Sequence, residues 1–224
     1  MASVVTIDGP TSSGKGTISR MVAARLHWHL LDSGALYRLV ALAGQKLGLE
    51  LDDIAGHAAA ARTLDVQFGA VQHEERIWLA GQDVTAQIRT AEAGVGASRV
   101  AAWPQVRDAL LDRQRRFARE PGLVADGRDM GTVVFVDAPL KVFLTASPQE
   151  RAQRRYKQLK DKGSDVSLAA LSREIAERDL KDSTRSVAPL RPAPDAHVID
   201  STHLGIQEVV EQVLALGRGR SLWP

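Results

Sequence analysis

The sequence predicts an α/β fold built around a parallel β-sheet. Short apolar segments of strand length alternate along the chain with longer segments that carry helix start signals, which is the pattern of a parallel sheet covered by helices. In addition, the first apolar segment, Ser3–Asp8, ends at a glycine-rich loop that leads into a helix. Strand, tight loop and helix in this order are common at the start of an α/β fold.

The N-terminal part of the chain is expected to contain two strands and three helices. Ser33 and Asp52 are expected to cap the second and third helices, because a side-chain oxygen at this position accepts a hydrogen bond from a free backbone N–H. In order, we expect a strand over Ser3–Asp8, a helix from about Lys15 to Leu26, a short strand over Trp28–Leu31, a helix from Ser33 to about Leu47, and a helix from Asp52 to about Leu64.

The middle of the chain looks inserted into this α/β core. Asp65–Ala70 and Arg76–Ala80 have strand-like composition and flank the polar segment Gln72–Glu75, which predicts a β-hairpin. The remaining predictions here are a helical segment that is interrupted at Gly94 and Gly96, and a helix from Pro104 to about Ala118.

The parallel-sheet pattern returns in the C-terminal half. Ser147-Pro148 is a strong helix start, because serine caps a helix and proline fits its first turn. We expect strands over Gly122–Asp126, Lys141–Thr145 and His197–Asp200, and helices over about Gln149–Lys162, Ser167–Lys181 and Ile206–Leu216.

Composition and charge limit the classes of function. The chain has 224 residues, which suits one domain with insertions or two small domains. It has no cysteine, no secretory-type N-terminus and no apolar run of about 18 residues, so we expect a cytoplasmic protein without a membrane span. Its net charge is +2 and no basic run exceeds two residues, so nucleic acid is not an expected partner.

The strongest motif is a phosphate-binding loop. Residues 9–17 read GPTSSGKGT and carry the G-x-x-x-x-G-K spacing of the Walker A motif. In this motif, backbone N–H groups and the N-terminus of the next helix surround the nucleotide phosphates, and the lysine adds a positive charge near the β- and γ-phosphates. We expect ATP to be bound by Gly9, Pro10, Thr11, Ser12, Ser13, Gly14, Lys15, Gly16 and Thr17.

The residue after the lysine departs from the common motif. Most Walker A loops have Ser or Thr there, whereas this chain has Gly16 followed by Thr17. We expect Thr17, ahead of Ser13, to contact Mg²⁺ directly or through water. Asp126, at the end of a predicted strand, is expected to support the ion through water.

Polar residues follow two of the predicted strands. In open parallel sheets, ligands bind beyond the carboxyl ends of the strands. Ser33 and Arg38 follow the second strand, and Arg128 and Asp129 follow a later one. We expect Arg128 to hold a phosphate and Asp129 to accept a hydrogen bond from an amino group on a base. A capped helix with a solvated arginine, or a simple polar turn, is the alternative.

Further arginines share helix faces. Arg151, Arg154 and Arg155 crowd one face, which is unfavourable unless an anion binds, and the polar Lys157–Asp165 that follows suits a mobile lid. Solvated helices with surface ion pairs are the alternative. A second set of residues at helical spacing consists of Arg178, Asp182 and Arg185. In this set, Asp182 could orient both arginines or accept a hydrogen bond from a ribose hydroxyl.

These features together predict phosphoryl transfer. If the acceptor is itself a phosphate monoester, it is largely a dianion at neutral pH, because its second pKa is about 6. No general base is then required, and the main demand is for cations that hold two negative groups in line. Arginines at several positions meet that demand.

Several segments resemble the bacterial cytidylate kinases, a family of P-loop nucleoside monophosphate kinases. The similarity covers approximately residues 4–211 and rests on Ile7–Pro10, Gly14–Thr17, Leu31–Ala35, Ala125–Thr132 and Val187–Leu190. It implies a three-layer P-loop fold with a central five-stranded parallel sheet. It also implies one kinase domain over residues 1–224, with a monophosphate-binding insertion at about 63–100 and a lid at about 151–165.

The resemblance further implies a reaction and residue roles. The reaction is transfer of the ATP γ-phosphate to CMP or dCMP, with Mg²⁺, by a monomeric enzyme of pyrimidine nucleotide metabolism. The catalytic positions are matched by Lys15, Arg128, Arg154 and Arg155. The substrate-binding positions are matched by Ser98, Arg107 and Asp129 at the cytosine, Arg38 and Arg128 at the CMP phosphate, and Ser33, Arg178, Asp182 and Arg185 around the sugar, with Arg185 as a base or sugar contact.

Two alternatives stay open from the sequence. One is another P-loop small-molecule kinase, acting on UMP, AMP or an acceptor such as shikimate. Asp129 with Arg107 and Ser98 favours cytosine, because an aspartate accepts from the amino group that uracil lacks. The other is a nucleotide-binding switch without catalysis, which would leave the arginines without a role.

Overall fold

The computed structural model describes residues 2–71, 74–161 and 163–223 and divides into two compact units. The first unit spans Met1–Asp32 and Arg115–Pro224, and the second spans Ser33–Gln114. Gln72 and His73, expected in a hairpin turn, and Lys162, expected at a helix end, lie outside the described residues.

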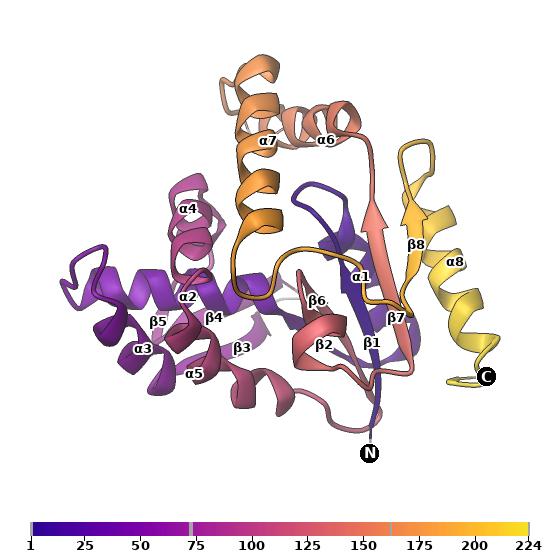
Figure 1. Ribbon diagram of the computed structural model, residues 1–224, viewed down its shortest axis with the longest axis horizontal. Coiled ribbons are helices and arrows are strands. Elements are labelled where there is room, and N and C mark those ends of the chain that lie inside the picture. The colour runs from indigo at the N-terminus through magenta and orange to yellow at the C-terminus, as the bar shows by residue number, and fades with distance from the viewer. Residues whose placement is uncertain (1, 72–73, 162, 224) are drawn as a thin grey trace. The chain divides into compact units, whose positions relative to one another are not determined.

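The first unit is built on a five-stranded parallel sheet (Figure 1). The predicted α/β class and the predicted parallel sheet are therefore confirmed. The central strand is β1, in which Ile7 lies opposite Asp126 on one side and Val142 on the other. In spatial order the strands are β2 (His29–Asp32), β6 (Gly122–Gly127), β1 (Ser3–Asp8), β7 (Leu140–Thr145) and β8 (His197–Asp200).

Two helices cover one face of this sheet. Alternate residues of a strand point to the same face, and Val5 and Ile7 of β1 enter one apolar cluster with α1 (Lys15–Leu26) and α8 (Ile206–Arg218). The other main helices, α6 (Pro148–Lys160) and α7 (Leu168–Thr184), contact each other. The strand arrows in Figure 1 point towards α6 and α7, so both helices lie beyond the carboxyl ends of the strands.

The second unit is mainly helical and carries a small sheet. The predicted hairpin is confirmed, since β3 and β4 pair antiparallel, and a short third strand, β5, was not predicted. The elements are α2 (Ser33–Lys46), α3 (Ile54–Arg62), β3 (Val66–Val71), β4 (Glu74–Leu79), β5 (Gln82–Asp83), the 3₁₀ turn η1 (Gln87–Arg89), α4 (Ala91–Val100) and α5 (Pro104–Arg115), whose last residue belongs to the first unit.

Several local predictions are corrected. Gly94 and Gly96 do not interrupt a helix, because α4 runs through both of them. A Cβ on Gly96 would lie 2.9 Å from the Cβ of Ala41, so this glycine lets α4 pack closely on α2. The cap of α3 is Asp53 rather than Asp52, and its carboxylate accepts from Gly56 N at 2.8 Å.

Several boundaries also shift, among them the start of β4, which lies at Glu74 rather than Arg76. β2 begins at His29, one residue after its expected start, and α5 ends at Arg115 rather than near Ala118. The helix expected over 167–181 continues to Thr184. Ser147 caps α6 as predicted, with its hydroxyl accepting from Glu150 N. Within the described ranges, every helix is too short or too polar to span a bilayer.

Candidate active site

The glycine-rich loop joins β1 to α1 at the carboxyl edge of the sheet. A Cβ on Gly9 would lie 2.0 Å from the carbonyl oxygen of Leu144, so only glycine lets the loop leave β1 so close to β7. Lys15 opens α1, is 8% exposed, and donates from Nζ to Pro10 O at 3.0 Å. The lysine is therefore held inside its own loop, at the N-terminus of a helix.

Burial and neighbouring charges set the pKa of Lys15. Burial and the nearby Arg128 together lower this pKa to about 7, although Asp126 opposes the shift. Burial also raises the pKa of Asp126 to about 6, against the effect of Lys15. The two groups titrate together, so the site can change its charge near neutral pH when a charged ligand arrives.

The carboxylate of Asp126 lies close to the residue that follows the lysine. A Cβ on Gly16 would lie 3.2 Å from Oδ2 of Asp126, so the carboxylate occupies the space next to this position. Oδ1 of Asp126 is buried and makes no hydrogen bond with the described residues. Carboxylate oxygens are preferred magnesium ligands, so this buried oxygen fits a role towards a divalent cation. The described residues contain no cluster of three or more His, Asp or Glu that would hold a metal alone.

The turn after β6 is tied to two other elements. Nε of Arg128 donates to Oδ2 of Asp182 in α7 at 3.1 Å. Asp129 is 2% exposed, and the two residues after it donate their backbone N–H groups to Asp8. A single turn of π-helix, η2 (Met130–Val134), follows. The turn is thus fixed by contacts on both sides.

Arg151 and Arg154 of α6 both reach the glycine-rich loop. Arg151 is buried, donates to Thr11 O at 3.2 Å and pairs with Asp179 at 2.6 Å. Arg154 donates to Ser13 O at 3.2 Å. Backbone carbonyls of the loop therefore accept from two arginines of the helix that begins the predicted lid.

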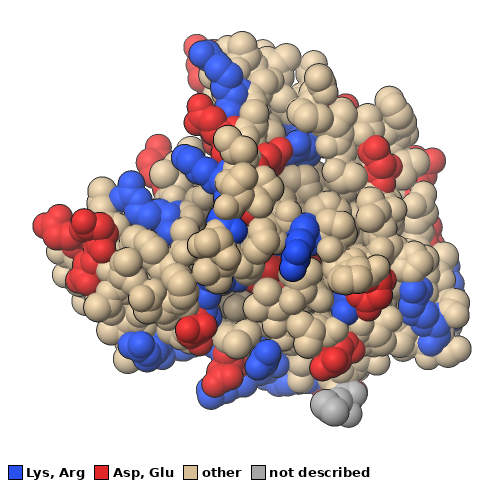
Figure 2. All heavy atoms as spheres, in the orientation of Figure 1, with Lys and Arg blue, Asp and Glu red and all other residues tan. Residues whose placement is uncertain are grey.

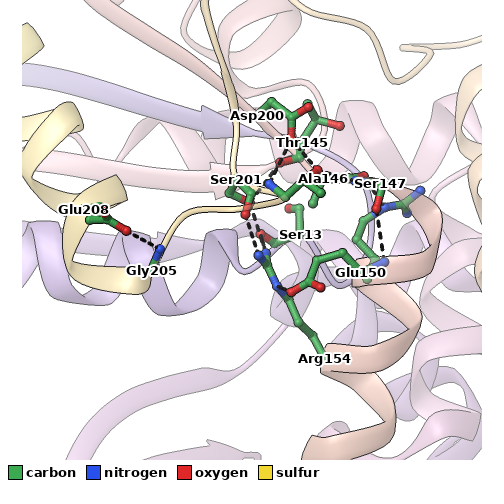
Figure 3. A network of polar contacts seen from close by, with 12 residues as sticks. Ser13, Thr145, Ala146, Ser147, Glu150, Arg154, Asp200, Ser201, Gly205 and Glu208 are labelled. Carbon is green, nitrogen blue, oxygen red and sulfur yellow. Dashed lines mark hydrogen bonds and ion pairs between the residues drawn. The ribbon is translucent and has the colours of Figure 1, made fainter.

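Arg154 also anchors to the end of β8 (Figure 3). Its Nη1 donates to Oγ of Ser201 at 3.0 Å, its Nη2 donates to the backbone oxygen of Ser201 at 2.6 Å, and Glu150 accepts from its Nε at 2.8 Å. Ser201 in turn donates from Oγ to Thr145 O. Arg155 differs, because its Nη1 donates to Gln158 on its own helix at 2.9 Å.

The prediction that Arg178, Asp182 and Arg185 share one helix face is wrong for Arg185. α7 ends at Thr184, so Arg185 follows the helix and does not share a helix face with Arg178 and Asp182. The chain turns back here: Arg185 donates to Ala188 O, and Leu190 N donates to Asp182 O at 2.8 Å. This gives the segment Val187–Leu190 a physical role, since it packs its backbone against the end of α7.

Four of the predicted substrate residues belong to the second unit. Ser33 opens α2 and donates to Gln114 Oε1 at 2.7 Å. Arg38 of α2 donates to Ile88 O at 2.7 Å and to Thr90 O at 3.1 Å. Arg107 of α5 is buried, donates to Ala101 O and lies 5.7 Å from the ring centroid of Tyr37. Ser98 is half-buried on α4.

Sequence reasoning missed three residues that organise the first unit. Arg151 was considered only as part of a charged face, and Asp8 and Ser201 were not considered. All three are buried. Asp8 is the last residue of β1, and Ser201 directly follows β8. A polar residue at the carboxyl end of a strand is the signal that would have found these two, whereas Arg151 lies on a helix.

Comparison with known proteins identifies the family. The family model described as cytidylate kinase matches residues 5–218. A cytidylate kinase of Stutzerimonas stutzeri is 57% identical over 221 residues, which cover 98% of this chain and 96% of the relative. A cytidylate kinase of Pseudomonas aeruginosa is 58% identical, and the match covers 94% of this chain and 93% of the relative. A cytidylate kinase of Pseudomonas syringae pv. tomato is 59% identical, and the match covers 96% of this chain and 94% of the relative.

A solved shikimate kinase from Acinetobacter baumannii, in complex with shikimate, overlaps with a TM-score of 0.48 at 16% identity, covering 100% of this chain and 97% of its own. That overlap is too loose to inform the acceptor. The family match and the three relatives agree over nearly the whole chain, and the chain belongs to the cytidylate kinase family.

Proposed function

We propose that this chain transfers the γ-phosphoryl group of Mg-ATP to CMP and dCMP, giving ADP with CDP or dCDP. The observation that carries the proposal is the family match over residues 5–218. The loop around Lys15 and the neighbouring Arg128 and Asp126 supply the charges that such a transfer needs.

The donor side is assigned to the glycine-rich loop. Backbone N–H groups of residues 9–17 and the ammonium of Lys15 would bind the ATP phosphates. The hydroxyl of Thr17 and the carboxylate of Asp126 would hold Mg²⁺, directly or through water. When bound, the ion neutralises charge on the phosphates, and it would also favour the ionised form of Asp126, whose pKa burial raises to about 6.

The acceptor side is assigned to the residues that match substrate positions of the family. Arg38 and Arg128 would grip the CMP phosphate through their planar guanidinium groups. The cytosine would be bound by Ser98, Arg107 and Asp129, and the sugar by Ser33, Arg178, Asp182 and Arg185. The side-chain oxygen of Asp129 would accept a hydrogen bond from the amino group of cytosine, whereas the corresponding oxygen of uracil offers no donor. This mismatch supports a preference for CMP over UMP.

The transfer itself requires no general base, because the attacking oxygen belongs to a phosphate dianion. Lys15, Arg128, Arg154 and Arg155 would stabilise the negative charge of the transferring group. Residues 151–165 would act as a lid that excludes water, and residues 63–100 as the monophosphate-binding insertion. Both segments are part of a single kinase domain in this proposal.

We also expect a cytoplasmic monomer without a nucleic-acid partner, since its substrates would be small nucleotides of the pyrimidine pathway. On the face seen in Figure 2, basic and acidic side chains are interspersed. Such a surface gives little support for binding a polyanion. Sedimentation at several protein concentrations would test the monomeric state.

The test is ADP formation from Mg-ATP with CMP, dCMP, UMP, AMP, GMP, TMP and shikimate as separate acceptors. Fast turnover with CMP and dCMP, weak turnover with UMP and none with the others is the expected result. Fast turnover with a different acceptor would keep the kinase and remove the cytosine roles of Ser98, Arg107 and Asp129. A folded protein that binds ATP but phosphorylates none of these acceptors would contradict the proposal.

A further inference from the structure

Asp8 joins the glycine-rich loop to the turn that carries Asp129. It is the last residue of β1 and directly precedes Gly9. Its Oδ1 accepts from Met130 N and its Oδ2 accepts from Gly131 N, each at 2.8 Å. Both carboxylate oxygens are therefore used to hold the two residues that follow Asp129.

A second observation shows that the turn is seated tightly on β1. A Cβ on Gly131 would lie 2.9 Å from Oγ1 of Thr6 and 3.1 Å from Cδ of Lys141. Thr6 and Asp8 are two residues apart on the strand, so their side chains point to the same face of the sheet. Thr6 limits how closely the turn approaches, and Asp8 holds it at that distance.

The environment of Asp8 indicates that these two bonds are needed. The side chain is buried, and desolvation raises the pKa of Asp8 to about 7, whereas the N–H groups of Gly131 and Met130 lower it. An apolar residue in place of Asp8 would avoid the cost of burying a carboxyl group. However, it would leave the buried N–H groups of Met130 and Gly131 without these partners.

We propose that Asp8 is a positioning residue that fixes the backbone after Asp129 and thereby sets the preference for cytosine over uracil. The inference rests on the proposed role of Asp129 as the group that binds the cytosine amino group. Asp8 does not touch the substrate in this scheme. It acts through the direction in which the Arg128–Asp129 turn leaves β6.

The test is the Asp8→Asn variant, which keeps the shape of the side chain but replaces one acceptor by an NH₂ group that faces a backbone N–H. Since hydrogen bonds to charged groups are worth about 10- to 100-fold in an equilibrium, we expect KM for CMP to rise by about that factor. The ratio of kcat/KM for CMP to that for UMP should fall by at least about tenfold. KM for ATP should change by less than about twofold.

A matched control is Asp53→Asn at the start of α3, outside residues 63–100. Asp53 also accepts from a backbone N–H, that of Gly56 at 2.8 Å. This variant should leave KM for CMP, KM for ATP and the CMP-to-UMP ratio of kcat/KM unchanged. A lower melting temperature of Asp8→Asn with an unchanged CMP-to-UMP ratio would overturn the proposal, because it would show a purely structural role. A rise in KM for ATP alone would also overturn it.

A second pair of variants tests the same geometry if Asp8→Asn fails to fold. Gly131→Ala should push the turn away from Thr6 and Asp8 and lower the CMP-to-UMP ratio. Combining it with Thr6→Ala removes Oγ1 and should restore the ratio at least in part. A ratio unaffected by Gly131→Ala would overturn the proposal.

The Asp129→Asn variant separates this proposal from the proposed function. Loss of the CMP preference in Asp129→Asn, together with an unchanged preference in Asp8→Asn, would remove only the positioning role of Asp8. An unchanged preference in Asp129→Asn would overturn both the cytosine role of Asp129 and the inference about Asp8.

Discussion

Arg128 and Asp182 form an ion pair of 3.1 Å that joins the turn after β6 to the last turn of α7. Their side chains are only 19% and 9% exposed, so the pair is poorly screened by solvent. Arg128 also lowers the pKa of Lys15 in the glycine-rich loop. One arginine therefore couples the helix that follows the predicted lid to the lysine that is expected to bind ATP.

Replacing Asp182 by Asn should weaken the acceptor site more than the donor site. The variant removes the charge that orients Arg128, and we expect KM for CMP to rise by about 10- to 100-fold, the worth of a hydrogen bond between charged groups. Steady-state kinetics with each substrate in turn would measure this. Glu211→Gln, which removes the partner of Arg25 at the surface of α8, is the control. Equal effects on KM for ATP and CMP would contradict the prediction.

Replacing Arg154 by Ala should lower turnover far more than stability. Its guanidinium lies against the loop carbonyl of Ser13 and is half-buried, and an arginine that stabilises a transferring phosphoryl group is worth about 10³-fold or more in kcat. Single-turnover rates and thermal unfolding would be compared for Arg154→Ala and for Arg173→Ala. Arg173 is exposed on α7 and serves as the control.

The Arg154 prediction would be contradicted by a kcat that falls no more than in the Arg173 control. A loss of melting temperature that accounts for the lost activity would contradict it as well. In that case the bonds from Arg154 to Ser201 would have only a structural role.

The sheet and most helices follow from local sequence signals. Buried parallel strands are continuous apolar runs, and Ser147-Pro148 and the glycine-rich loop mark helix starts by local chemistry. The family resemblance, which the family match and the three relatives confirm, came from short segments whose spacing is specific. The conformations of the loops that carry the site had no comparable local signal.

The failures have tertiary causes. Gly96 was expected to break a helix, but its lack of a Cβ is used for packing against Ala41, a partner distant in sequence. Asp8 binds backbone groups that lie 122 and 123 positions later in the chain, so no local pattern indicates its partners. Arg151 looked like a surface charge, although it is buried against Thr11 and Asp179.

The C-terminal tail should stabilise the first unit without affecting catalysis. The ring of Trp223 packs edge-on against Trp28 at 5.4 Å between centroids. Trp223 is half-buried, so Trp223→Ala should cost about 2 kcal/mol, less than for a fully buried tryptophan. Thermal unfolding should then show a midpoint lower by about 4–8 °C. Trp223→Phe keeps a ring and should lose less. A fall in kcat at a temperature where the variant is folded would contradict a purely structural role.

Binding of ATP should be accompanied by proton uptake at Lys15. In the protein without ligand, burial and the cation Arg128 lower the pKa of Lys15 to about 7, so the side chain is mostly neutral at pH 8. The ATP phosphates favour the charged ammonium and raise this pKa, which means that a proton must be taken up when ATP binds above pH 7. By linkage, the affinity for ATP should fall as the pH rises from about 7 to 9.

Calorimetric titration of ATP in buffers of different ionisation enthalpy measures the number of protons taken up. The number should be larger at pH 8 than at pH 6, where Lys15 is already charged. Lys15→Arg is the informative control, because arginine stays protonated throughout this range and should abolish the uptake while keeping a positive charge in the loop. The same uptake in wild type and Lys15→Arg at pH 8 would contradict the assignment of the proton to Lys15.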